Sequence, residues 1–137
     1  MNSWVERIRN VIDYIERNLA EKILVKDIAE KACVSEYHFR RIFSELCGIT
    51  VGEYIRNRRL SIAAQELSSG TIKVIDAAIK YGYESPDSFA RAFARFHGIL
   101  PSEAKGKGVK LREFTPLRMA TKQRLWLQEY GQCFLVH

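Results

Sequence analysis

One stretch of this sequence occurs twice. "SEYHFRRIFSELCGITVGEYI" spans residues 35–55, and "ESPDSFARAFARFHGILPSEA" spans residues 84–104. At an offset of 50 the identical residues include Phe39 and Phe89, Arg41 and Arg91, Phe43 and Phe93, Gly48 and Gly98, and Ile49 and Ile99. Upstream, at an offset of 49, they include Asp27 and Asp76, Ala29 and Ala78, and Lys31 and Lys80. The repeat predicts two copies of one supersecondary unit, with one extra residue in the turn of the second.

Apolar residues recur at three- and four-residue steps along most of the chain, which is typical of amphipathic helices. We expect an all-α fold of about seven helices. They cover residues 5–19, 25–32, 35–48, 51–68 and 72–80, followed by a sixth that opens at Ser85 and a short seventh at Pro101.

The second helix of each copy begins at a serine, Ser35 or Ser85, whose hydroxyl suits a helix cap. Thr50 and Glu53 have the spacing of a capping box for the long helix between the copies. A short helix, a tight turn and a capped second helix form the helix-turn-helix pattern. Helix pairs with glycine turns also occur in many other all-α proteins, so the outer faces must decide the function.

The outer face of each second helix carries arginine, with Arg41 and Arg91 at the same repeat position. The guanidinium fork binds guanine O6 and N7 together. A solvated surface charge is the alternative for any one of these side chains, and the shared position favours DNA recognition. The candidate DNA-binding residues are Ser35, Glu36, Tyr37, Arg40, Arg41, Ser85, Asp87, Ser88, Arg91 and Arg95.

The formal net charge of +6 favours a polyanionic partner. Two functions remain open on this basis. A sequence-specific binder of double-stranded DNA should show a preferred site on top of a steep salt dependence. The alternative, a non-specific nucleic-acid or anionic-surface binding module, should bind anionic vesicles as tightly as duplex DNA.

Other functional classes lack their motifs. No nucleophile elbow, phosphate loop or zinc-protease motif occurs, so we do not expect an enzyme. The three cysteines, Cys33, Cys47 and Cys133, have no metal-ligand spacing, so we expect no metal and no cofactor. We expect Cys33 and Cys47 to be small buried residues. Without an apolar signal-peptide core or a membrane span, the expected location is the cytoplasm, with no membrane partner.

The run "RNRR" at residues 56–59 is ambiguous. Arg56 and Arg59 share one helix face, whereas Arg58 points elsewhere and is expected to pair with a carboxylate at the edge of the core. Phosphate contact stays open for each of the three. His38 and His97 are expected to be surface or packing residues rather than ligands.

Residues 5–105 resemble the DNA-binding domain of the AraC/XylS transcription regulators. The resemblance rests on "DIAEKACVSEYHFRRIFSELCGITVGEYIRNRRLSIAAQEL" and "IDAAIKYGYESPDSFARAFARFHGILPSE". It is strongest to members with the DNA-binding domain first, such as the small multiple-antibiotic-resistance and superoxide-response activators and right-origin-binding protein.

The resemblance implies a DNA-binding domain over residues 1–105, with helix-turn-helix units at 8–49 and 72–105 and a rigid linker helix at 51–68. Both recognition helices would enter successive major-groove segments about one duplex turn, or ~34 Å, apart. Because the two copies differ outside their cores, one monomer would read an asymmetric site. The resemblance also implies RNA polymerase as a partner and activation rather than repression.

Four positions depart from the family pattern. Tyr37 stands where tryptophan is frequent, Arg40 where glutamine is familiar, and Pro86 and Asp87 where glutamine is frequent. The carboxylate of Asp87 would be repelled by phosphate. We therefore expect the first unit to contribute more of the specificity.

The sequence changes character over residues 106–137. Val109 and Leu111 alternate with charged residues before Pro116, a pattern that predicts a linker leading into a strand. The segment resembles the start of an effector-binding domain. It is either the truncated beginning of such a domain, which we favour, or a private extension. A small-molecule effector would then act only through a domain absent from this chain.

Overall fold

The computed structural model describes residues 3–105 and 111–116 of the 137-residue chain. Within these ranges the protein is all-α and contains no strand, which confirms the predicted fold class. The elements are α1 (Trp4–Arg17), α2 (Val25–Lys31), α3 (Glu36–Cys47), α4 (Val51–Ser69), α5 (Val74–Lys80), α6 (Pro86–His97) and a 3₁₀ helix η1 (Pro101–Lys105). Helix α5 begins two residues later than predicted, because Lys73 has an extended backbone and takes the cap position.

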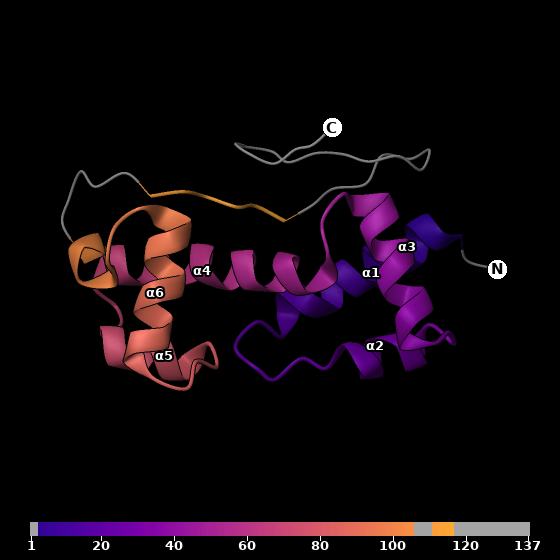
Figure 1. Ribbon diagram of the computed structural model, residues 1–137, viewed down its shortest axis with the longest axis horizontal. Helices are drawn as coiled ribbons and strands as arrows, with labels where there is room; N and C mark the ends of the chain where they lie inside the picture. Colours follow the sequence, from indigo (N-terminus) through magenta and orange to yellow (C-terminus); the bar gives the residue numbers. More distant parts are fainter. Residues whose placement is uncertain (1–2, 106–110, 117–137) are drawn as a thin grey trace.

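Helix α4 is the axis of the molecule (Figure 1). Its 19 residues correspond to about 28 Å of helix. Helices α1, α2 and α3 pack around its first half, and α5, α6 and η1 pack around its second half. Such a helix must be apolar on several faces, since different partners cover different sides of it.

The two halves have separate apolar cores. The first core is built on Phe39 and Phe43 of α3, and the second on Phe89 and Phe93 of α6, and all four side chains are fully buried. These are the phenylalanines that the repeat pairs at an offset of 50. The duplicated sequence therefore folds as two duplicated units, as predicted.

The turn between the two helices of each unit closes in the same way. The N–H of Val34 donates to the carbonyl of Ala29 at 3.1 Å in the first unit, and Tyr83 donates to Ala78 at 2.9 Å in the second. Each turn also contains one residue with a left-handed backbone, namely Gly82 (φ 83°) and its counterpart Cys33 (φ 61°).

The prediction of two buried cysteines is wrong for Cys33, which is exposed. The left-handed turn directs its side chain outward, a local geometry that composition does not reveal. Cys47 is half-buried, and burial raises the pKa of its thiol to about 12.

After η1 the chain runs back along α4 (Figure 1). Residues 111–116 form no helix or strand, and Phe114 lies in the first core while Leu111 packs against the second. The predicted strand over Val109 and Leu111 is therefore not seen at Leu111. Of residues 106–137, where the beginning of an effector-binding domain was expected, residues 106–110 (with Val109) and 117–137 lie outside the described residues. No described helix is both long enough and apolar enough to span a membrane.

Candidate nucleic-acid interface

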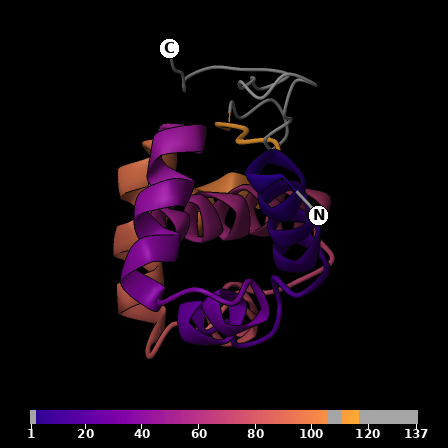
Figure 2. The same cartoon turned by 90° about the vertical axis from the view of Figure 1, so that its right-hand side faces the viewer.

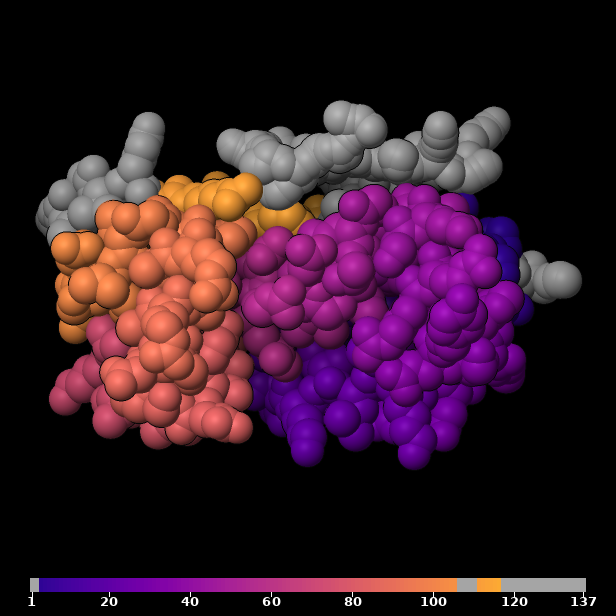
Figure 3. Space-filling view, in the orientation of Figure 1, coloured from indigo at the N-terminus to yellow at the C-terminus, as the bar shows by residue number. Residues whose placement is uncertain are grey.

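Helices α3 and α6 lie at opposite ends of α4 and on the same side of it. Figures 1 and 2 agree on this arrangement, and Figure 3 shows both helices at the surface of one face. Each helix turns its phenylalanines toward a core, so its opposite side faces outward. The two helices that the sequence identified as candidate readers of DNA are thus presented together.

The N-terminal turn of α3 is organised by a serine cap. The hydroxyl of Ser35 accepts from the backbone N–H of His38 at 3.1 Å. Tyr37, in the first turn, is 72 % exposed. Because the cap satisfies one N–H and others at the helix start stay free, this end of α3 is a favourable place for a phosphate.

The two candidate arginines of α3 are held in ion pairs along the helix. Arg40 lies 2.9 Å from Glu36, and Arg41 lies 3.3 Å from Glu45. Exposed pairs of this kind are worth only about 0.3–0.5 kcal/mol. A guanine edge or a phosphate can therefore replace the carboxylate at little cost.

Helix α6 opens with a reciprocal capping box. The hydroxyl of Ser85 accepts from the N–H of Ser88 at 3.1 Å, and the hydroxyl of Ser88 lies 3.3 Å from the N–H of Ser85. Both serines are half-buried, whereas Asp87 between them is exposed. Ser85 and Ser88 therefore shape the helix start, and Asp87 faces outward, where its charge also complements the helix dipole.

The arginines of α6 differ from those of α3. Arg91 and Arg95 are exposed, and no ion pair in residues 3–105 and 111–116 involves either of them. At the offset of 50, Arg95 stands where α3 has Glu45, the partner of Arg41. Among the described residues, the second unit therefore presents two unpaired guanidinium groups, which offset the negative charge of Asp87.

The three arginines of α4 have separate surroundings. Arg58 is buried and pairs with Glu16 at 2.8 Å, as the sequence predicted for this residue. Arg59 donates to the backbone carbonyls of Leu19 and Glu21 at 2.9 and 2.7 Å, which ties the loop after α1 to α4. Arg56 is exposed, so it is the member of the run that is sterically open to a phosphate.

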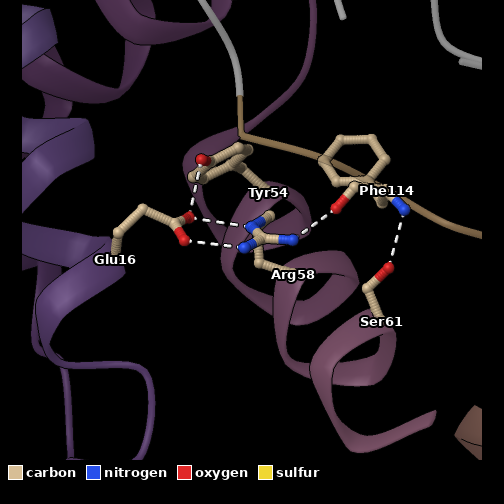
Figure 4. Close-up of polar contacts among 5 residues, drawn as sticks. All are labelled: Glu16, Tyr54, Arg58, Ser61 and Phe114. Atoms are coloured by element: carbon tan, nitrogen blue, oxygen red, sulfur yellow. Dashed lines mark hydrogen bonds and ion pairs between the residues drawn. The ribbon is translucent and has the colours of Figure 1, made fainter. Parts of the chain in front are cut away.

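A buried polar cluster joins α1, α4 and the segment 111–116 (Figure 4). The carboxylate of Glu16 accepts from the hydroxyl of Tyr54 at 2.9 Å and from two nitrogens of Arg58 at 2.8 Å each. A third nitrogen of Arg58 donates to the carbonyl of Phe114. Burial acts to lower the pKa of Arg58, but hydrogen bonds and charge from Glu16 outweigh it and raise the pKa.

Sequence analysis missed Glu16 and Tyr54 as members of this cluster. A signal existed for Glu16, which follows Ile12 by four residues and precedes Leu19 by three, and so lies on the apolar face of α1. A carboxylate on such a face needs a buried partner. The identity of that partner is not visible from local spacing.

A second polar tie holds α5 to α4. Glu66 accepts from the ammonium of Lys80 and from the hydroxyl of Tyr81, both at 2.7 Å. Burial acts to raise the pKa of Glu66, but these two hydrogen bonds outweigh it and lower the pKa. Each helix-turn-helix unit is thus fixed to the central helix by a carboxylate as well as by its core.

His97 is a packing residue, as predicted, and its protonation state follows from its partners. Nε2 lies 3.0 Å from the carbonyl of Leu60, and Nδ1 lies 3.1 Å from the backbone N–H of Arg112. A carbonyl only accepts and a backbone N–H only donates, so Nε2 carries the proton and Nδ1 the lone pair. Burial lowers the pKa of His97 from its ordinary value of 6.5, and the charge of Arg112 lowers it further.

We expect the protein to lose stability as the pH falls below about 6.5, because unfolded His97 then binds a proton that the folded residue resists. The measurement is urea unfolding at about pH 7.5 and pH 5.5. The control is His97→Gln, which retains an N–H donor but does not titrate, and should show a smaller loss over the same interval. Equal losses in both proteins would contradict the assignment.

No cluster of three or more His, Cys, Asp or Glu side chains within the described residues could hold a metal ion. The exposed side chains that the sequence nominated for DNA binding belong to the outer surface formed by α3 and α6. We call this surface, defined by Tyr37, Arg40, Arg41, Arg91 and Arg95, the reading face.

Comparisons with known proteins agree with this geometry. A family model described as a helix-turn-helix domain matches residues 28–107. The transcriptional activator AarP of Providencia stuartii is 40% identical over 95 residues, which cover 69% of this chain and 70% of AarP.

Two solved structures share the fold. A probable AraC family transcriptional regulator from Rhodopseudomonas palustris matches with a TM-score of 0.66 and 26% identity, over 73% of this chain and 94% of that one. The DNA-binding domain of AdpA, a global transcriptional factor solved with a target DNA, matches with a TM-score of 0.62 and 23% identity, over 77% of this chain and 91% of that one. From these matches and its duplicated helix-turn-helix architecture, the chain belongs to the AraC family of transcription regulators.

Proposed function

We propose that one copy of this chain reads an asymmetric DNA site by placing α3 and α6 in successive major-groove segments on one side of the duplex. As a member of its family, the protein is a sequence-specific DNA-binding transcription regulator. The observation that carries the two-segment proposal is the shared side of α3 and α6 at the two ends of α4. The length of α4, about 28 Å, is close to the ~34 Å of one duplex turn.

The reading face supplies the base contacts in this proposal. Arg41 and Arg91 each contact a guanine, and Tyr37 packs on a thymine methyl or donates to a phosphate. Arg40 and Arg95 add contacts on the flanks. The exchange of a weak carboxylate partner for a base edge allows Arg40 and Arg41 to bind DNA without a large conformational change.

The cap residues act on the DNA backbone. Ser35 and Ser85, with Ser88, fix the first turns of α3 and α6, and the free backbone amides at the start of α3 hold phosphate. Glu36 and Asp87 stand beside these sites. Their charge disfavours a closer approach of phosphate and sets how deeply each helix enters the groove.

The protein acts on transcription as an activator in this proposal, in contact with RNA polymerase. The support is the activator AarP, which is 40% identical to the matched region. Residues 1–105 carry the DNA-binding function in this proposal, and residues 111–116 pack against both of its cores. An effector, if one is used, acts through a domain outside this chain. Because its partner is DNA, the protein acts in the cytoplasm in this proposal. Catalysis is not part of the proposed function.

We expect Arg41→Ala and Arg91→Ala each to relax the base preference in one half of the site. Loss of a bidentate guanine contact costs about 1–3 kcal/mol of discrimination, which is roughly 5- to 150-fold in affinity. The measurement is selection from a randomised duplex library followed by sequencing. The wild type should select two blocks about ten base pairs apart, and each variant should lose the preference in a different block.

The matched control is Arg9→Ala, which removes the same charge from an exposed position on α1, a helix that is not part of the reading face. It should retain both blocks. If the wild type selects no sequence, and all three variants lose only salt-sensitive affinity, the arginines contact phosphates without reading bases. The chain would then be a non-specific nucleic-acid or anionic-surface binder, which binding to anionic vesicles would separate further.

A further inference from the structure

The segment 111–116 is attached to both helix-turn-helix units. Phe114 is 1 % exposed in the first core, where its ring lies edge-on to Tyr54 with centroids 5.9 Å apart. Leu111 packs against the second core. Six residues therefore span the junction between the units, parallel to α4 (Figure 1).

The backbone of Phe114 is held on both sides by the middle of α4. Its N–H donates to the hydroxyl of Ser61 at 2.6 Å, and its carbonyl accepts from Arg58 (Figure 4). Arg58 and Ser61 are three residues apart, so they lie on one face of the helix. Arg58 is in turn fixed by Glu16 of α1, which links the segment to the first unit a second time.

The other end of the segment is held by α6. The backbone N–H of Arg112 donates to Nδ1 of His97 at 3.1 Å, and the guanidinium of Arg112 lies 4.8 Å from the ring centroid of Phe96. Phe96 itself packs against both cores. His97 and Phe96 lie at the end of α6, the helix that carries Arg91 and Arg95. This attachment therefore helps to hold α6 in position.

A single helix resists bending less well than a helix braced by a second connection. Each of α3 and α6 would lie about half a duplex turn, or ~17 Å, from the middle of α4. A bend of about 10° there would displace either helix by about 3 Å, which is close to one base-pair step. The segment crosses that pivot and is fixed to both sides of it. Its loss would therefore change the spacing between α3 and α6 without altering either reading surface.

We propose that Phe114, held by Ser61 and Arg58, is a positioning residue that fixes the separation of α3 and α6 and so selects the spacing between the two halves of the DNA site. This inference rests on the proposed function. It adds a role for a segment that touches no DNA. Specificity for spacing would then reside in a brace that runs along α4, while specificity for sequence resides in the reading face.

The first test measures the geometry without DNA. Spin labels are attached to two exposed positions in different units, and the full chain carries the substitutions Arg9→Cys, Asp76→Cys, Cys33→Gly, Cys47→Ala and Cys133→Ala. Pulsed dipolar spectroscopy then gives the distribution of distances between α1 and α5. We expect one narrow distribution of distances for the labelled chain with Phe114 and Ser61 intact. Adding Phe114→Ala or Ser61→Ala should broaden this distribution.

The second test measures affinity on duplexes in which the two selected blocks are separated by different numbers of base pairs. We expect the wild type to lose about tenfold or more when the spacing changes by one, since a base contact is forfeited. In Phe114→Ala the difference between neighbouring spacings should fall to about threefold or less. The preference within each block should stay unchanged. Phe114→Leu, which keeps an apolar anchor, should behave nearly as the wild type.

The matched control is Ile28→Ala, which opens a cavity in the first core from α2, a helix on the other side of α4 from the segment in Figure 1. It should lower stability yet retain the narrow distance distribution and the spacing preference. The proposal is overturned if Phe114→Ala and Ser61→Ala keep both, or if Ile28→Ala loses them equally. A wild type that selects no two-block site overturns the proposed function and this inference together. Unchanged distances in Phe114→Ala, beside an intact two-block site in the wild type, overturn the inference alone.

Discussion

Arg58→Ala should lower the free energy of unfolding by about 3–5 kcal/mol, because it leaves the partly buried carboxylate of Glu16 without its charge partner. The carbonyl of Phe114 also loses its donor. Urea unfolding followed by circular dichroism measures the change. For a small domain with a total stability of about 5–15 kcal/mol, this loss would leave a large part of the protein unfolded on mild heating.

Two variants separate the ion pair from simple loss of volume. Arg58→Met retains apolar bulk, and Glu16→Gln retains a hydrogen-bond acceptor, and their combination completes a double-mutant cycle. We expect the double variant to be more stable than the sum of the two single losses predicts, since neither charge is then left alone. If Arg58→Ala weakens DNA binding with unfolding unchanged, Arg58 acts as a phosphate contact and the buried-pair assignment is wrong.

Phe89→Ala should destabilise the second unit by about 3–5 kcal/mol. The side chain is fully buried, and its ring lies 5.3 Å from that of Tyr83 and 5.6 Å from that of Phe93. Removing it deletes the centre of a small core that few neighbouring side chains could collapse to fill. Thermal unfolding and the amide spectrum of α5 and α6 would report the loss.

The repeat offers an internal comparison for this prediction. Phe39→Ala removes the equivalent ring from the first unit, where Phe43 lies 6.0 Å away, and should cost a similar amount. Phe89→Leu, which retains most of the apolar volume, should cost less than about 1.5 kcal/mol. A loss under about 1 kcal/mol for Phe89→Ala would mean that the second core is not the tightly packed unit described above.

The helices and their ends could be predicted from the sequence because they depend on neighbours a few residues apart. Ser35 and Ser85 cap α3 and α6 as expected, and Gly48 and Gly98 end them in the left-handed conformation. The buried apolar faces of these helices follow the same three- and four-residue periodicity. The helix caps, helix ends and buried faces occur in both units because the local sequence repeats. The assignment made for one unit therefore supports the same assignment in the other.

The sequence placed the candidate reading arginines at equivalent positions, but sequence analysis did not compare their ion-pair partners. Local spacing places Arg41 and Arg91 at equivalent positions, yet Arg41 pairs with Glu45 while Arg91 is unpaired among the described residues. The difference follows from one substitution, Arg95 in place of Glu45. It could have been inferred from the sequence by comparing helix neighbours four residues apart.

The contacts between the two units, in contrast, join residues that are far apart in the sequence. Glu16 and Arg58 are 42 residues apart in sequence, and Arg58 and Phe114 are 56 apart. The sequence indicated that Arg58 would pair with a carboxylate and that residues 106–137 would leave the helical pattern. Neither the partner nor the return of the segment along α4 could be predicted.

The sequence by itself determined two helix-turn-helix units, their capped helices, their phenylalanine cores and the arginines on their outer faces, since each depends on hydrogen bonds and side-chain spacing within a turn or two of helix. Only the tertiary structure decided that α3 and α6 share one side of α4 and that Phe114 braces both units. Such contacts between distant residues depend on how whole helices pack, and a single extended residue such as Phe114 has no periodic pattern to reveal its partner.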